Sequence, residues 1–139
     1  MAARDTPTTD DVIAAAEFRA ALRQFLRRSE RIAQRCGLTP QRYTLLMMIK
    51  GAPDGSEQST VTELSERLQL AQSTVTELVR RAEEAGLVAR EKSQRDARVA
   101  HLRLTADGEK RLLESFTALA TEREQLRQAI AHFDGGVPI

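Results

Sequence analysis

The sequence predicts a mainly α-helical protein with one small β element between its helices. In most segments between residues 11 and 133, apolar residues recur with the 3.6-residue period of a helix. Two short runs, 87–92 and 99–104, are instead typical of strands, and the second alternates apolar with polar residues. Turn-rich segments join these elements, and a length of 139 residues favours one domain, residues 1–139.

Two short helices joined by a tight turn form the centre of this prediction. The first is expected over residues 60–68 and the second over 72–85, with a break at 69–71. From Val75 on, apolar residues recur at i, i+3, i+4 and i+7, which is one buried stripe. Gly86 follows, where a left-handed residue would end the helix. The second helix of such a pair begins with small polar residues, and a helix of this kind can lie in a DNA major groove.

The two strands and the polar loop 93–98 between them predict a β-hairpin, or wing. With the helix pair, it resembles the MarR family of winged-helix transcriptional regulators. The resemblance rests on Ser73-Thr-Val-Thr76 with Leu78-Val79, on Glu84-Ala-Gly-Leu-Val88, and on Asp96-Ala-Arg98 followed by Leu104-Thr105 and Ala106-Asp-Gly108. Together with the flanking helices, it covers about residues 12–133.

The resemblance implies a particular division of the chain. A winged helix-turn-helix DNA-binding domain would span residues 39–105. Dimerisation helices would flank it at 11–36 and 106–133, and flexible ends would lie at 1–10 and 134–139. In the family, the terminal helices of two chains interlock to form a dimer.

The first flanking helix should begin at a cap on Asp10 or Asp11 and run through Cys36. Ser29 interrupts its apolar stripe, which consists of Phe18, Leu22, Phe25, Leu26, Ile32 and Ala33. Another face carries arginines at i+4 spacing, namely Arg19, Arg23, Arg27 and Arg31. Such a run is typical of a solvated face. The resemblance also allows a dimer interface or the lining of an effector pocket.

The remaining helices are expected on both sides of the wing. Pro40 suits the first turn of a core helix that ends at Lys50. After the wing, a helix is expected over residues 106–119. Thr121-Glu-Arg-Glu124 has capping-box spacing, which favours a separate helix to Phe133, with one bent helix as the alternative.

The exposed face of residues 72–85 supplies candidates for DNA contact, namely Gln72, Ser73, Thr74, Thr76 and Arg80. Short hydroxyls at a helix N-terminus can bind phosphates. Gln72, Thr76 and Arg80 are better placed for base edges, where a bidentate pair gives about 1–3 kcal/mol of discrimination. Many relatives carry a basic residue where this chain has Glu77. This carboxylate either reads a cytosine amino group or makes no base contact, and Arg81 can pair with it.

The wing, residues 87–103, carries a local charge of +3 from five cations and two acids. The cations are Arg90, Lys92, Arg95, Arg98 and Arg103. An arginine at a hairpin tip can enter a narrow minor groove. The resemblance assigns this role to Arg98, with Asp96 orienting its guanidinium, and Arg95 is a second tip candidate. Alternatively, Asp96 and Arg98 only close the hairpin.

Composition argues against several other classes of protein. The net charge of +1 means that DNA affinity must come from a local patch. No run approaches the ~18 apolar residues of a membrane span, so we expect a cytoplasmic protein with no membrane partner. His101, His132 and Cys36 lack metal-ligand spacing, and no catalytic constellation is present. We expect no metal, no cofactor and no enzymatic activity.

These observations favour a homodimeric repressor that binds double-stranded DNA at a pseudo-palindromic operator and responds to a small-molecule effector. One alternative is a winged-helix module that binds protein without specific DNA contact. Another is a thiol-based redox sensor. Against the latter, Cys36 is expected near the end of a helix, where the dipole disfavours a thiolate. We therefore expect a buried, inert thiol.

Overall fold

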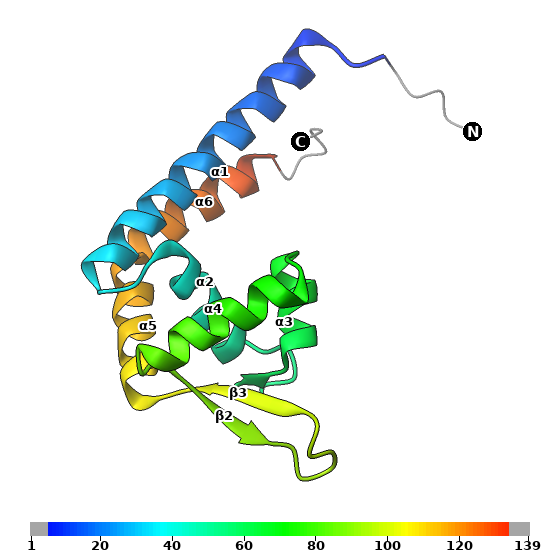
Figure 1. Ribbon diagram of the computed structural model, residues 1–139. Helices are drawn as coiled ribbons and strands as arrows, with labels where there is room; N and C mark the ends of the chain where they lie inside the picture. Colours follow the sequence, from blue (N-terminus) through cyan, green and yellow to red (C-terminus); the bar gives the residue numbers. More distant parts are fainter. Residues whose placement is uncertain (1–5, 134–139) are drawn as a thin grey trace.

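The computed structural model describes residues 6–133 and has the predicted fold class, mainly helical with a small antiparallel sheet (Figure 1). A winged-helix body and a helical arm make up the molecule. The elements in chain order are α1 (Thr9–Arg35), α2 (Pro40–Lys50), β1 (Gln58–Ser59), α3 (Val61–Leu68), α4 (Gln72–Glu84), β2 (Val88–Lys92), β3 (Ala100–Leu104), α5 (Ala106–Ala118) and α6 (Ala120–Phe133).

The arm consists of α1 and α6, which pack side by side and run away from the body in Figure 1. The body consists of α2, α3, α4 and the sheet, and α5 connects it to the arm. Across residues 6–133, no helix combines the length and the apolarity that crossing a membrane requires.

The body has one core, and α2 lies at its centre. Thr39 caps α2 by accepting a hydrogen bond from the Arg42 amide at 3.2 Å, and Pro40 occupies the first turn as predicted. The fully buried side chains come from almost every element of the body and include Leu38, Leu45, Leu46, Ile49, Leu64, Val75, Val79 and Leu102. Lys50 at the end of α2 forms ion pairs with Glu57 at 3.0 Å and with Glu109 of α5. These contacts hold the end of α2 against the segment before β1 and against α5.

The sheet has three antiparallel strands in the order β1-β3-β2. Val88 pairs with Leu104 and Lys92 with Ala100, so β2 and β3 form the predicted hairpin. In β3, Leu102 is buried and Arg103 is exposed, which confirms the predicted alternation. Strand β1 was not predicted, because a strand of two residues is too short to show alternation.

The start of α1 differs from the prediction. Thr8 is the cap, and it forms a capping box with Asp11 through hydrogen bonds of 3.2 and 2.8 Å. Asp10 and Asp11 are therefore in the first turn, where acidic side chains favour the helix dipole, and the cap predicted there is wrong. Of the predicted flexible ends, residues 1–5 and 134–139 lie outside the described residues.

The apolar stripe of α1 also differs from the prediction, at Ser29 and at Leu26. Ser29 is buried in the stripe because its hydroxyl donates a hydrogen bond to the Phe25 carbonyl at 2.8 Å, so it does not interrupt packing. Leu26, which we assigned to the stripe, is 51% exposed. The side chain of Phe133, at the end of α6, lies outside the described part of the structure.

Two separate C-terminal helices are present, but the predicted capping box is wrong. Because α6 begins at Ala120, Thr121 is already inside the helix, and the Glu124 carboxylate accepts hydrogen bonds from Arg127. Arg123 instead fixes the turn. Its guanidinium donates to the Phe116 carbonyl at 2.5 Å and lies 3.6 Å above the centroid of the Phe116 ring.

A compact junction joins the end of α4 to the start of α5. Gly86 has a φ of +75°, the left-handed conformation that the sequence predicted. The Thr105 hydroxyl donates to the Gly86 carbonyl at 2.6 Å and caps α5 by accepting from the Gly108 amide at 3.0 Å. A Cβ atom at Gly108 would lie 2.1 Å from the Leu87 carbonyl oxygen, so this close approach requires glycine. The two segments that flank the hairpin are thus held together at its base.

Candidate nucleic-acid interface

The helix-turn-helix is held by local hydrogen bonds. Thr60 and Glu63 form a capping box at the start of α3. After α3, Gln69 adopts a left-handed conformation with a φ of 55°, and the Ser65 hydroxyl donates to the Leu70 carbonyl at 2.5 Å. The chain thus reverses within three residues and places α4 against α3.

Helix α4 buries one face and exposes the face predicted to contact DNA. Val75, Val79 and Ala82 are completely buried, as the periodicity predicted. On the opposite side, Gln72, Ser73, Thr74 and Thr76 are exposed. Within the described residues, these four side chains make no intramolecular hydrogen bond. No side chain caps α4 at Ala71, so its first amide groups are also available to an anion.

Arg80 has the predicted exposed position, but its guanidinium is already engaged. Its Nε atom donates to Oε2 of Glu77 at 2.9 Å, and its Nη2 atom donates to Oε1 of the same carboxylate at 2.5 Å. The Nη1 atom donates to Glu84. Arg81 also donates to Glu77, at 3.1 Å, as its i, i+4 spacing predicted. Glu77 therefore bridges two arginines of the recognition helix.

The electrostatics of this cluster strongly favour the ionised carboxylate. The hydrogen bonds from Arg80, and secondarily those from Arg81, lower the pKa of Glu77 from 4.5 to about 2. The same contacts raise the pKa of Arg80. All three charges are therefore present at neutral pH, and the cluster needs no proton to form.

The wing tip presents Arg98 to solvent. Its side chain is 92% exposed, and its Nε atom lies 3.4 Å from Oδ1 of Asp96. The same oxygen accepts a hydrogen bond from the Arg98 amide at 3.0 Å. Ser93 accepts from the Arg95 amide at 3.2 Å, which closes the other side of the loop. Asp96 thus holds both the backbone and the guanidinium of Arg98.

The other cations of the wing differ in how they are paired. Arg90 forms an ion pair with Glu83 of α4 at 2.7 Å, and Arg103 lies 3.9 Å from Glu91. Lys92 and Arg95 are exposed and have no ion-pair partner in the part of the chain that the structure describes. The cations available to an external anion are therefore concentrated toward the tip.

In Figure 1, α4 crosses the front of the body, and the β2–β3 hairpin extends below it. Two ion pairs of this surface were not predicted from the sequence. One joins Glu77 and Arg80, although their i, i+3 spacing is visible in the sequence. The other joins Arg90 to Glu83 and links the wing to α4, a contact that depends on tertiary structure.

The arrangement of helix pair, hairpin and flanking helices is similar to that of known proteins. Residues 37–99 match the profile of the MarR family, a match that spans a little under half of the chain. The matched residues run from the end of α1 to the loop of the wing. A search of curated protein sequences finds no significant match.

Solved structures of MarR-family proteins match over most of the chain. AbsC, a MarR family transcriptional regulator from Streptomyces coelicolor, has a TM-score of 0.69 at 20% identity, with 96% of this chain and 86% of that chain covered. A mutant of MarR from E. coli, complexed with operator DNA, has a TM-score of 0.67 at 15% identity, with coverages of 95% and 91%.

A third similar structure is a mutant of MepR from S. aureus, bound to an oligodeoxyribonucleotide. It has a TM-score of 0.63 at 19% identity, with 86% of this chain and 94% of that chain covered. At these identities, the three structures share the fold with this chain.

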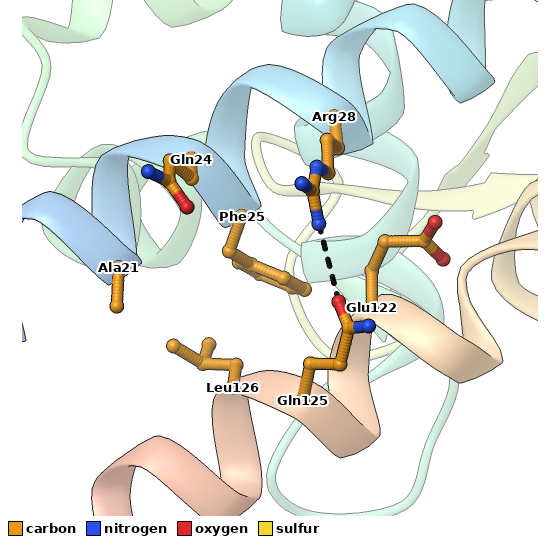
Figure 2. Close-up of a pocket in the computed structure, with 7 residues that line it drawn as sticks. All are labelled: Ala21, Gln24, Phe25, Arg28, Glu122, Gln125 and Leu126. Atoms are coloured by element: carbon orange, nitrogen blue, oxygen red, sulfur yellow. Dashed lines mark hydrogen bonds between the residues drawn. The ribbon is translucent and has the colours of Figure 1, made fainter.

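Two hollows lie where α1 meets other helices. The larger, about 290 Å³, lies where α1, α2, α5 and α6 meet and is lined mainly by apolar side chains, including Phe25, Met47 and Phe116. The smaller, about 200 Å³, lies between α1 and α6 and is more polar (Figure 2). In it, Arg28 donates a hydrogen bond to Gln125 at 3.1 Å, beside Phe25.

The remaining candidate groups, Cys36 and the arginines of α1, belong neither to α4 nor to the wing. Cys36 is the C-terminal cap of α1 and is half-buried, so the prediction of a buried thiol is wrong in degree. The predicted arginine run on α1 is exposed at Arg19, Arg23, Arg27 and Arg31. Within the described residues, no group of His, Cys, Asp and Glu side chains could hold a metal ion.

Proposed function

We propose that this MarR-family chain is a DNA-binding transcription regulator that acts as a homodimeric repressor. One observation carries the proposal: the exposed hydroxyl and amide side chains at the start of α4 lie in the same body as a wing whose tip carries exposed cations. Gln72, Thr76 and Arg80 would face base edges in the major groove, and Ser73 and Thr74 would bind phosphates. Two similar proteins, MarR from E. coli and MepR from S. aureus, have structures with DNA.

In the proposed complex, the wing would follow the DNA backbone to the adjacent minor groove. Arg98 would enter that groove, where the potential is most negative, and Arg95 would lie beside it. Asp96 would limit the orientations of the Arg98 guanidinium, so less rotational freedom would be lost on binding.

The arm would pair with the arm of a second chain, which would bring in a second DNA-binding body. Large apolar side chains of α1, α5 and α6 are exposed, and they are Val12, Ile13, Leu26, Leu113, Phe116 and Ile130. Exposed apolar side chains in such number are typical of an interface. Pairing two arms about a two-fold axis would cover them and place two recognition helices about 34–36 Å apart, one turn of DNA. This geometry is the reason for proposing a pseudo-palindromic operator.

A small-molecule effector would bind the larger hollow, since it touches both the arm and the body. Its apolar lining and the nearby Arg123 suit a ligand with an aromatic ring and an anionic group. Such a ligand could release DNA only if it bound more tightly to a second conformation of the dimer than to the DNA-bound one. In that second conformation, the spacing of the two recognition helices would not match one turn of DNA.

DNA selection with the purified protein tests the proposal. We expect a salt-sensitive mobility shift with random duplex DNA at low salt, followed by enrichment of two inverted half-sites about 10 base pairs apart. A folded protein that shifts no duplex at low salt would contradict the proposal and would favour the alternative of a protein-binding module.

Sedimentation of the intact chain at micromolar concentration tests the dimer. We expect twice the monomer mass of 15.5 kDa. Deletion from Glu122 onward removes most of α6 and should give a monomeric or aggregating protein with weak affinity for single half-sites. A stable monomer of the intact chain that still binds a full operator tightly would refute the two-headed arrangement.

The redox alternative is tested by replacing Cys36, the only cysteine of the chain. We expect Cys36→Ser to leave operator binding unchanged, and hydroperoxide to release no DNA from the wild type. The position at the C-terminal end of α1 disfavours a thiolate, and the chain has no second thiol to resolve a sulfenic acid. Peroxide release of the wild type, but not of the variant, would identify a thiol sensor.

A further inference from the structure

We infer that Glu77 is a specificity-determining residue, a carboxylate inside the DNA-reading surface that suppresses binding to random sequence by neutralising Arg80. The inference rests on the proposed DNA-binding function and adds to it a means of discrimination. It goes beyond the two roles that the sequence allowed for Glu77, a reader of cytosine or a residue that makes no base contact and can pair with Arg81.

The geometry supports this role because Glu77 occupies Arg80 in two places. A guanidinium has five N–H groups, and Arg80 donates from its Nε and Nη2 atoms to the two oxygens of Glu77, at 2.9 and 2.5 Å. A third donor, on Nη1, contacts Glu84. In the free protein, the arginine best placed to read a base is therefore held along the surface of its own helix.

The charge of the helix supports the same role. Between Gln72 and Glu84, two arginines face three glutamates, which gives a net charge of −1. Glu77 lies one turn before Arg80 and pairs with it, so it would enter the groove with this reading residue and would not remain at the edge. On random DNA, the helix would then add no net attraction for the phosphates, and non-specific affinity would come from the wing.

At the operator, a guanine in register could replace Glu77, because its O6 and N7 atoms present two acceptors to one guanidinium edge. Glu77 would not be left unpaired by this exchange, since Arg81 already donates to its Oε1 atom at 3.1 Å. Replacing Glu77 by guanine as the partner of Arg80 therefore costs little free energy where a guanine is aligned. At other sequences no such partner is present, and affinity does not increase. Discrimination increases because the competing carboxylate is present at every site and is displaced at only one.

Glu77→Gln tests the inference, since it keeps the shape of the side chain and removes its charge. We would measure the affinity of the full-length protein for a random-sequence duplex and for the selected operator, each across a salt series. An additional effective cation changes the salt slope by about 0.9, which is about eightfold in affinity at 0.1 M salt. We expect this gain on random DNA, a smaller one on the operator, and therefore a lower specificity ratio.

Glu114→Gln is the matched control, because Glu114 is exposed on α5, away from α4 and the wing. It changes the net charge of the chain equally and should leave both affinities within about twofold. Equal gains in the two variants would overturn the inference, since the effect would then be one of overall charge. A loss on the operator without a gain on random DNA would also overturn it and would make Glu77 a reader of cytosine.

The wild-type protein separates this inference from the proposed function. If the wild type shifts no duplex at all, the proposed function fails, and the role of Glu77 fails with it. If the wild type binds its operator and Glu77→Gln matches it on both kinds of DNA, only the role of Glu77 is refuted.

Discussion

The recognition helix and the wing both carry arginines, but they hold them differently. On α4, Arg80 and Arg81 are paired with Glu77 on the same helix. At the wing tip, Arg98 has only one long contact with Asp96, and its side chain is almost fully exposed. The first region presents hydroxyls and amides with its charges cancelled, whereas the second presents charge.

This difference corresponds to two kinds of DNA contact. Attraction to phosphates acts at every sequence and falls steeply with salt, whereas contacts to base edges depend on register and much less on salt. Free cations in the wing suit the first kind, and a neutralised helix suits the second. In the proposed complex, the wing would thus supply affinity and α4 would supply specificity, and variants can test this separation.

The largest effect is expected for the double variant Glu77→Gln/Arg80→Gln, which removes the pair without changing the net charge. Affinity for random DNA should stay within about twofold, because the pair already contributes no net charge there. Affinity for the selected operator should fall by roughly 1–3 kcal/mol, with relaxed preference at one base position. Binding titrations on both DNAs measure this. Equal losses on the two would mean that the helix also supplies non-specific attraction.

The wing should give the opposite pattern. Arg98→Ala should weaken binding to random DNA and to the operator alike, by about eightfold at 0.1 M salt, and should reduce the salt slope by about one. Arg19→Ala, which removes an exposed arginine from α1, is the matched control and should change little. Equal losses for the two variants, or none for Arg98→Ala, would remove the wing from the interface.

A smaller effect is expected at Asp96, and it separates orientation from loop closure. Asp96→Ala removes the acceptor of the Arg98 amide and guanidinium, and should weaken DNA binding by about 0.5–1.5 kcal/mol, the range of one hydrogen bond. Asp96→Asn keeps an oxygen for the amide but loses the charge. Full rescue by asparagine would indicate that Asp96 only closes the hairpin, and partial rescue would indicate that its charge also orients Arg98.

Much of the fold could be predicted because local chemistry determined it. The period of apolar residues placed α4 correctly to within one residue, and Gly86 has the left-handed conformation expected after a helix. The alternation of apolar and polar residues in β3 predicted which of its faces is buried. The cap of α1 was predicted wrongly because Thr8, Asp10 and Asp11 are all good capping residues, and only the backbone conformation at Thr8 decides among them.

The partners of long, exposed side chains were harder to predict. Glu77, Glu83 and Glu84 are all near Arg80 in the sequence, and pairs at i, i+3 and i, i+4 differ by only a few tenths of a kcal/mol. Glu83 turns instead to Arg90, a contact that exists only because the wing folds back beside α4. The exposure of Leu26 was also unpredictable, since periodicity does not state which face another chain would cover.

The smallest effect is expected from pH. The pKa of Glu77 is lowered to about 2 in the folded protein, below the value near 4.3 of an unfolded chain. Such a group contributes its full stabilisation above the unfolded pKa, and the contribution is lost as pH falls through the folded pKa. The pair with Arg80 should therefore be intact from pH 8 to pH 5 and open only in stronger acid.

This expectation gives a sharp test of the comparison. The ratio of random-DNA affinities of Glu77→Gln and wild type should not change between pH 8 and pH 5, and taking this ratio cancels the effects of groups that the two proteins share. In the free protein, an NMR titration of the Glu77 carboxyl should have its midpoint near 2, and Arg80→Gln should move it toward 4.5. A midpoint near 4.5 in the wild type would mean that Arg80 is not held by Glu77 in solution. The recognition helix would then carry a free cation as the wing does, and the contrast between them would disappear.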